Sequence, residues 1–239
     1  GTIQTANQEG EIVAFDSASG RYFVTNPASD EIDVFTASAT GALAHVMSIP
    51  LAGPPNSVAV KYGLVAVAVE GPTKQDPGQV QFFSADTGLA NGLAVTVGAL
   101  PDMVAFTSNG QKVLTANEGE ADEATGLNNP EGSVSIVDVA SRTVATASFA
   151  PWNGQKASLQ AAGVRLSDVN NITLAQDVEP EYLTINAAGT TAYVTLQENN
   201  AIAVVDIAAA SVTAILPLGE KNHNLPGNAF DPSNQDGID

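Results

Sequence analysis

A repeat of about 45 residues constrains the fold of this chain more than any other feature of its sequence. Val13, Val58, Val104 and Leu183 occupy equivalent positions and are separated by 45, 46 and 79 residues. The last interval corresponds to one repeat plus about 33 inserted residues. Each repeat contains four short apolar runs rich in Val, Ile, Phe and Thr, with turn residues such as Asn109-Gly110 between them. Four strands in a repeat of this length predict one blade of a β-propeller.

The predicted fold is therefore all-β, a β-propeller built of four-stranded blades. Its blades are expected at 11–51, 56–98, 102–150 and 181–218, with an insertion at 151–180 and a C-terminal loop at 219–239. Only Ser158–Val164, in the insertion, has a pattern that predicts a short helix. A blade buries its faces only against its neighbours. The four blades form either a compact ring or part of a larger ring completed by other blades, and the second interpretation is favoured.

The charge of the chain narrows the range of partners. The 239 residues include 26 Asp and Glu against 8 Lys and Arg, which gives a net charge of -18. Because 44% of the residues are hydrophobic and only 14% are charged, the sequence is typical of a folded protein. Eight scattered basic residues disfavour nucleic acid and anionic membranes as partners. A surplus of carboxylates instead favours divalent cations, Ca²⁺ above all.

Three absences bear on where the protein is located: Cys, an apolar stretch long enough to span a membrane, and a signal peptide. There is no Cys, which excludes disulfide scaffolds, thiolate zinc sites and cysteine nucleophiles. The most apolar stretch, Ala201–Gly219, contains Asp206, Ser211 and Thr213 and is not expected to enter a membrane. The first ten residues have no apolar signal-peptide core, although a signal peptide could have been removed. The absence of Cys fits secretion without requiring it, and the expectation of a secreted or cell-surface protein, its signal peptide removed, comes from the family resemblance given below.

Acidic residues recur at two equivalent places in the repeats: just before the first strand, and between the second and third strands. Because neighbouring strands are antiparallel, both places lie at one end of the blades. We therefore expect an acidic rim with little basic charge, in which like charges raise one another's pKa unless a cation is present. The predicted Ca²⁺ ligands on this rim are Glu70, Asp102, Glu118, Glu120, Glu179, Glu181 and Glu198. Solvated loop carboxylates that serve solubility are the alternative.

A second candidate for Ca²⁺ lies in the C-terminal segment. Asp231 and Asp236 belong to a run of oxygen-bearing side chains that ends in Gly237. The spacing resembles half of a calcium-binding loop, but Pro232 interrupts the pattern. An Asx-rich turn is the alternative.

Catalytic patterns are sparse. The sequence has no G-x-S-x-G nucleophile elbow, no glycine-rich phosphate loop and no H-E-x-x-H, so no nucleotide or haem cofactor is expected. Of the two histidines, His45 is expected to pack in an outer strand. If the protein is an enzyme, metal-assisted hydrolysis of a phosphoric ester is the reaction that needs no side-chain nucleophile. The candidate anion contacts are Lys74, Arg165, Lys221 and His223.

Several motifs resemble a known family. They include Ala116-Asn-Glu-Gly-Glu120, Glu179-Pro-Glu-Tyr182 and Gln197-Glu-Asn-Asn-Ala201. Across essentially its whole length the chain is similar to the choice-of-anchor I family, secreted bacterial propeller proteins often labelled alkaline phosphatase-like or phytase-like. The resemblance implies a YncE-like, seven-bladed propeller, exported and tethered to the cell surface. It also implies roles for Glu118, Glu120, Glu179, Glu181 and Glu198, which match the acidic motifs of the family.

Two functions of different class follow from this sequence. One is an extracellular binding or structural module that binds cations and assembles with other chains through exposed blade edges. The other is a Ca²⁺-dependent phosphoesterase. The absence of a nucleophile paired with a base favours the first.

Overall fold

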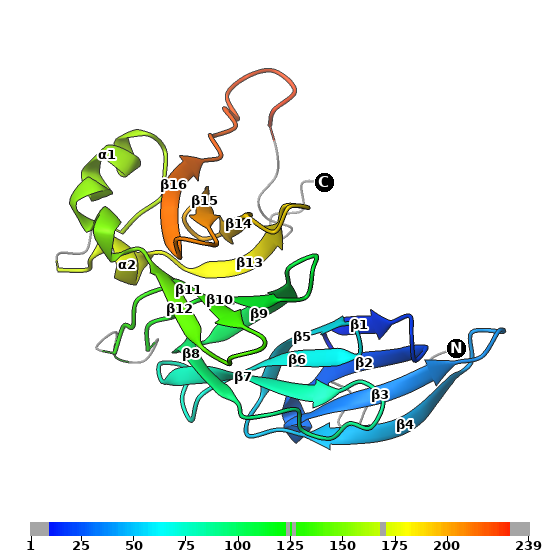
Figure 1. Cartoon of the computed structure of the whole chain (residues 1–239). Coiled ribbons are helices and arrows are strands. Elements are labelled where there is room, and N and C mark those ends of the chain that lie inside the picture. Colours follow the sequence, from blue (N-terminus) through cyan, green and yellow to red (C-terminus); the bar gives the residue numbers. More distant parts are fainter. Residues whose placement is uncertain (1–9, 123–124, 126–127, 168–170, 230–239) are drawn as a thin grey trace.

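The structure, a computed structural model, describes residues 10–122, 125, 128–167 and 171–229. The strands form four separate antiparallel sheets of four strands each, joined in the order of the sequence. The all-β fold of four-stranded, blade-like sheets is thus confirmed (Figure 1).

Each sheet contains four consecutive strands of the chain. The first is built of β1 (Val13–Asp16), β2 (Arg21–Asn26), β3 (Glu31–Ala37) and β4 (Leu43–Pro50), and the second of β5 (Pro55–Lys61), β6 (Leu64–Val69), β7 (Pro77–Ser84) and β8 (Val95–Ala99). The third is built of β9 (Pro101–Phe106), β10 (Lys112–Asn117), β11 (Ser133–Asp138) and β12 (Val144–Ser148), and the fourth of β13 (Pro180–Ile185), β14 (Thr191–Leu196), β15 (Ala201–Asp206) and β16 (Ser211–Pro217). These sheets are called blades 1 to 4.

The blades stand side by side in an open arc. Their first strands, β1, β5, β9 and β13, lie next to one another in that order, and blades 1 and 4 occupy the two ends of the arc (Figure 1). The turns after these first strands are linked across the blades: the Tyr62 hydroxyl donates to the Ser108 carbonyl at 3.3 Å, and Ser108 Oγ donates to the Ala187 carbonyl at 2.9 Å. Each blade is therefore held by its neighbours in the sequence, as expected for a repeat architecture.

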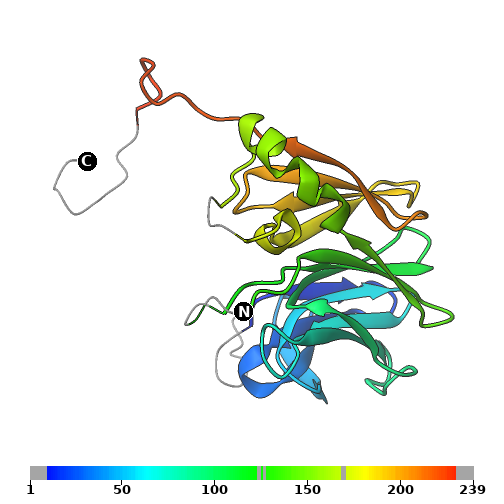
Figure 2. The same ribbon diagram turned by 90° about the vertical axis from the view of Figure 1, so that its left-hand side faces the viewer.

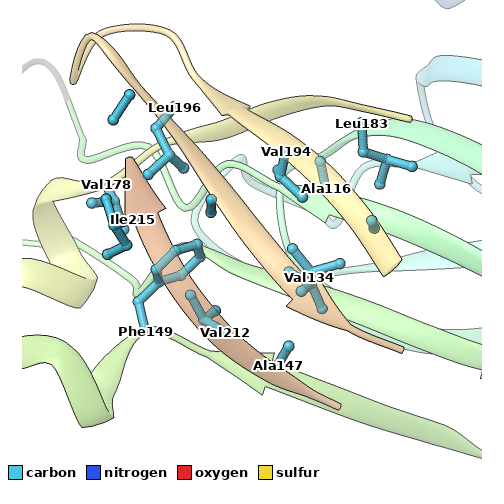
Figure 3. Close-up of a cluster of buried hydrophobic side chains, with 14 of the residues drawn as sticks. Ala116, Val134, Ala147, Phe149, Val178, Leu183, Val194, Leu196, Val212 and Ile215 are labelled. Atoms are coloured by element: carbon cyan, nitrogen blue, oxygen red, sulfur yellow. The ribbon is translucent and has the colours of Figure 1, made fainter. Parts of the chain in front are cut away.

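Successive side chains of a strand point to opposite faces of the sheet, and the middle strands β6, β10 and β11 are buried on both faces. Separate apolar clusters fill the space between blades 1 and 2, between blades 2 and 3, and between blades 3 and 4. The last is the largest, and the Phe149 side chain is fully buried within it among Val134, Val194 and Ile215 (Figure 3). Burying such side chains is the main stabilising contribution to the arc.

The insertion between blades 3 and 4 folds over that cluster. It contains a 3-10 helix (Ala150–Gln155), α1 (Lys156–Ala161) and α2 (Leu174–Asp177), which lie beside blade 4 (Figure 2). Lys156 Nζ and Asp177 Oδ2 form an ion pair at 3.0 Å between the two α-helices. Trp152 Nε1 donates to the Val212 carbonyl of β16 at 3.2 Å.

The helix expected at 158–164 is present but displaced. The structure has α1 at Lys156–Ala161, and Val164 is a buried core residue outside the helix. The sequence analysis also missed α2, although its first turn carries a recognisable signal. Thr173 accepts from the Gln176 amide at 3.2 Å while Gln176 Oε1 accepts from the Thr173 amide at 3.2 Å, a capping box.

Candidate functional site

One edge of the arc gathers the carboxylates that the repeat pattern predicted for the rim. At this edge β9 begins opposite the end of β10, with Pro101 paired to Asn117, and β13 begins opposite the end of β14, with Pro180 paired to Leu196. The short segments that enter the first strands and the loops that leave the second strands therefore meet. We call the resulting group of side chains the acidic edge: Glu70, Asp102, Glu118, Glu120, Glu179, Glu181 and Glu198.

Two glycines allow close backbone packing at the acidic edge, one within the β10–β11 loop of blade 3 and one between that loop and the segment that enters blade 4. Gly119, between two of the acidic residues, has φ of +71°, a conformation that other residues rarely adopt. Its α-carbon faces the Glu131–Gly132 peptide, which a β-carbon would approach to 2.7 Å. At Gly132 a β-carbon would come within 2.2 Å of the Val178 carbonyl oxygen, immediately before the acidic start of blade 4. Because they have no side chain, both glycines let the neighbouring backbone segments pack against them.

Two buried asparagines fix the ends of the acidic loops, and the sequence analysis missed both. Asn117 Nδ2 donates to Ser133 Oγ at 3.1 Å and to Ser135 Oγ at 2.9 Å. Asn199 Nδ2 donates to the carbonyls of Arg165 at 3.0 Å and Asp177 at 2.9 Å. The Asn199 Oδ1 accepts from the Glu179 amide at 3.2 Å. Both asparagines belong to the motifs that resemble the family, which is the signal that could have identified them.

Crowding raises the pKa of several carboxyl groups on the acidic edge. Burial, with the charges of Asp102, Glu120, Glu179 and Glu181, raises the pKa of Glu118 to about 8. Burial, a hydrogen bond to the Glu198 carboxyl and neighbouring charges raise that of Glu181 to about 7.

The pKa values of two further carboxyl groups on the acidic edge are also raised. Burial, followed by the charges of Glu11 and Glu70, raises the pKa of Asp102, although Lys74 opposes this. Burial, followed by the charges of Glu198, Glu120 and Asp177, raises the pKa of Glu179. These groups therefore bind protons, or another cation, more readily than isolated carboxylates do.

Lys74 is the basic residue that the structure places beside this edge. Its Nζ lies 3.2 Å from Glu120 Oε2, and this hydrogen bond is the main reason that the pKa of Lys74 is raised. Gln75 Nε2 donates to the backbone carbonyl of Glu120 at 3.2 Å. Lys74, predicted as an anion contact, is thus paired with a carboxylate.

The carboxylates of the acidic edge do not form a ready-made metal cage. Within the part of the chain that the structure describes, no three Asp, Glu or His side chains are placed so that together they could hold a metal ion. Asp231 and Asp236, the other predicted ligands, lie outside the described residues. A cation on the acidic edge would therefore be held by pairs of carboxylates together with water, or after side chains rotate.

The other predicted anion contacts lie near the end of blade 4. Arg165 and Lys221 line the same pocket, with Gln197 of the β14–β15 turn between them in the sequence. His223 Nδ1 hydrogen-bonds to the Asn228 carbonyl oxygen at 2.6 Å in the segment after β16 and does not line this pocket. His45 lies in the outer strand β4, as expected, with its Nε2 3.3 Å from Asp33 Oδ1.

The antiparallel four-stranded blades and the loops gathered at one edge define a β-propeller protein. The sequence model of the choice-of-anchor I domain matches residues 11–239. The chain belongs to the choice-of-anchor I family, and membership implies a secreted or cell-surface protein. In the described residues no helix is long and apolar enough to cross a membrane. No curated protein matches the sequence at a significant level.

Solved structures share the fold at low sequence identity. The hydrazine synthase of Kuenenia stuttgartiensis is 14% identical over 87% of this chain and 74% of its own, with a TM-score of 0.52. A chain of a nidogen/laminin complex is 13% identical over 87% and 64%, with a TM-score of 0.55. A functionally unknown protein from Desulfotomaculum acetoxidans is 10% identical over 88% and 56%, with a TM-score of 0.58. In the last two, the match spans less than two thirds of the other chain.

Proposed function

We propose that this protein is an extracellular Ca²⁺-binding propeller module that assembles with other protein chains. The observation that supports cation binding is the raised pKa of Asp102, Glu118, Glu179 and Glu181 on one edge. Near neutral pH Glu118 and Glu181 exchange protons with the solvent, and the ionised carboxylates of the edge repel one another. A divalent cation would relieve the repulsion without the protons.

Ca²⁺ suits this edge better than other common cations. It accepts six to eight oxygen ligands in flexible geometry, including water and pairs of carboxylates. The acidic edge offers oxygen ligands from loops of different blades, and no Cys is available for a softer metal. Mg²⁺ requires nearly ideal octahedral geometry, which loops from separate blades are less suited to supply.

Thermal unfolding tests this proposal. Chelator-treated protein at about pH 8, titrated with CaCl₂, should show a Tm increase of roughly 5–10 °C once the ion is about 100-fold above its Kd. NaCl at equal ionic strength is the necessary control, because screening alone weakens repulsion between exposed carboxylates.

A matched pair of variants locates the effect. Glu118→Gln should remove most of the Ca²⁺ response, whereas Asp86→Asn, an exposed carboxylate of blade 2, should retain it. A Tm that is unchanged by millimolar Ca²⁺, or that NaCl raises equally, would contradict cation binding.

Assembly with another chain is supported by the outer face of blade 4. Tyr193 is directly opposite Val204, and Ile202 is opposite Leu216, on the face that points away from the blade 3 core. Tyr193 is 44% exposed and Leu216 is 50% exposed. The equivalent face of blade 3 is covered by blade 4, so we propose that a sheet from another chain covers this one.

Native mass measurement tests the assembly. At increasing concentration the 24.3 kDa chain should give species of higher mass, alone or with a co-purifying chain. Tyr193→Ser together with Leu216→Ser should shift the population to the single chain. Leu93→Ser, at an exposed position of blade 2, is the control and should not. A single chain at all concentrations, with no partner, would contradict this part of the proposal.

A Ca²⁺-dependent phosphoesterase is the second candidate. One observation favours it: Arg165 Nε donates to the Glu198 backbone carbonyl, which places a guanidinium directly behind the acidic edge. Turnover of a phosphomonoester should then require Ca²⁺ and be lost in Glu118→Gln plus Glu181→Gln. Turnover that survives both chelation and these substitutions would reject this mechanism.

A further inference from the structure

A pocket of about 570 Å³ lies where three segments meet beside blade 4. One wall is the end of α1 and the part of the insertion that follows it, with Gln160, Gly163, Val164 and Arg165, and a second is the β14–β15 turn with Gln197 and Asn200. The third is the segment Gly219–Lys221, which follows β16. The volume lies within the range of small-molecule sites.

Hydrogen bonds hold the walls of this pocket together. The Arg165 amide donates to the Asn199 carbonyl at 2.8 Å, which joins the insertion to the turn. Asn200 Nδ2 donates to the Gly219 carbonyl at 3.0 Å, and the Leu218 amide donates to the Asn200 carbonyl at 2.9 Å. The pocket is therefore shaped by fixed backbone before any ligand binds.

The charge of the pocket is opposite in sign to that of the protein as a whole. Two of the eight basic residues, Arg165 and Lys221, line it together with one carboxylate, Glu220. Within the described residues, neither cation forms an ion pair with a carboxylate. The lining thus carries a net charge of about +1 in a chain whose net charge is -18.

The other polar groups suit hydroxyl-bearing ligands. Gln197 is exposed and brings a side-chain amide that can both donate and accept a hydrogen bond. Glu220 can accept from hydroxyl groups but repels a second negative charge on the ligand. The pocket lining is mainly polar, which disfavours an apolar ligand.

We propose that this pocket binds a small monoanionic hydroxylated molecule of the uronic acid class. Its carboxylate would lie between the Arg165 guanidinium and the Lys221 ammonium, and its hydroxyl groups would contact Gln197 and Glu220. Charge-assisted hydrogen bonds of this kind are the strong ones in small-ligand recognition. The site requires neither a metal ion nor turnover. It is separate from the proposed Ca²⁺ binding and assembly, and it shares Arg165 with the phosphoesterase candidate.

Calorimetry on the full chain tests the site, with chelator present so that cation binding does not contribute. Glucuronate should bind saturably, and high NaCl should weaken the binding because it screens the charges. Glucose, which has the same ring without the charge, should bind about ten-fold more weakly or not measurably. Inorganic phosphate and glucose 6-phosphate are titrated in the same way, to test whether the pocket prefers a phosphate group to a carboxylate.

Substitutions of the pocket residues test which side chains bind glucuronate. Arg165→Gln and Lys221→Gln should each lower the affinity for glucuronate about ten-fold, while Lys61→Gln, at a turn of blade 2, should change it less than about two-fold. Lys221→Gln should not disturb the fold, since the described structure gives the Lys221 side chain no ion pair or hydrogen bond to lose. The Tm of each variant confirms that it folds. Absence of glucuronate binding, equal loss in the Lys61 variant, or tighter binding of either phosphate would overturn the proposal.

Discussion

Glu181, near the start of β13, and Glu198, in the turn after β14, lie close enough for their carboxyl groups to share a hydrogen bond. Such a bond requires a proton on one of the two groups, and that proton is retained because burial and neighbouring charges raise the pKa of Glu181 to about 7. The acidic edge therefore changes its charge within the physiological pH range, where isolated carboxylates do not.

Stability should fall as the pH rises from about 5.5 to about 8.5. Glu118 and Glu181 have folded-state pKa values raised to about 8 and about 7 from the usual glutamate value of 4.5. A group with a raised pKa stabilises the folded state fully below its unfolded pKa, and this stabilisation is lost as the pH passes the folded pKa. In metal-free protein, Tm should drop by several degrees over this interval, roughly 2–4 °C for each kcal/mol.

Glu118→Gln should flatten this pH dependence, since the amide cannot ionise. Its Tm should equal that of the wild type at the acidic end and exceed it at the alkaline end. Asp16 and Asp138 have lowered pKa values and lose their contribution only under more acidic conditions, so they do not disturb the comparison. A Tm that rises with pH in metal-free protein would show that ionisation of the buried carboxylates on the acidic edge does not destabilise the protein.

Gly132→Ala should destabilise the protein by about 1–3 kcal/mol, because the new methyl group would overlap the Val178 carbonyl oxygen. Gly154→Ala is the matched control, since a β-carbon there meets nothing within 4 Å and the backbone needs no positive φ. Urea unfolding of both variants gives the two free energies. Equal stability would mean that the close approach between the loops of blades 3 and 4 is not required.

Asn199→Ala should cost about 2–4 kcal/mol. The substitution leaves two carbonyls and one amide without the partner that Asn199 supplies, and an unsatisfied buried group costs roughly 1–3 kcal/mol. Asn128→Ala, at an exposed position, should be neutral within about 0.5 kcal/mol. If both variants unfold at the same urea concentration as the wild type, Asn199 does not join the insertion to blade 4.

Phe149→Ala should destabilise by about 3–5 kcal/mol, as expected for a fully buried aromatic side chain. Leu93, which is 82% exposed, provides the control Leu93→Ala, whose effect should be small. Because Phe149 lies in the cluster shared by blades 3 and 4, amide hydrogen exchange should quicken in both blades and much less in blade 1.

The repeat predicted the blades because each strand of a propeller is a short apolar run that can be recognised from a few consecutive residues. Apolar runs such as Leu64–Val69 are bounded by turn residues, and the period places their acidic ends at one edge whatever the ring size. Glu118 and Glu181 were therefore predicted to lie on the same rim although 63 residues separate them. That part of the site follows from topology alone.

Contacts made outside the repeat could not be predicted in this way. The pairing of Asn199 with Arg165 and Asp177 depends on how the insertion folds back, and no periodicity specifies that path. The same holds for the pocket that contains Arg165 and Lys221, whose walls come from the insertion, a turn and the segment after β16. Whether the carboxylates bind Ca²⁺ is likewise a matter of side-chain placement, which the sequence pattern does not specify.

The insertion between blades 3 and 4 interrupts the repeat, and a protein engineer comparing repeats would choose it first for deletion. Leu159, Val164 and Leu174 of this segment are, however, buried in the same cluster as Phe149. A shortened chain joining Ala150 directly to Glu179 would remove these side chains and expose the rest of that cluster to water. The exposed turn at 38–42, between β3 and β4, buries no apolar side chain, so fusion tags and loop grafts are better placed there.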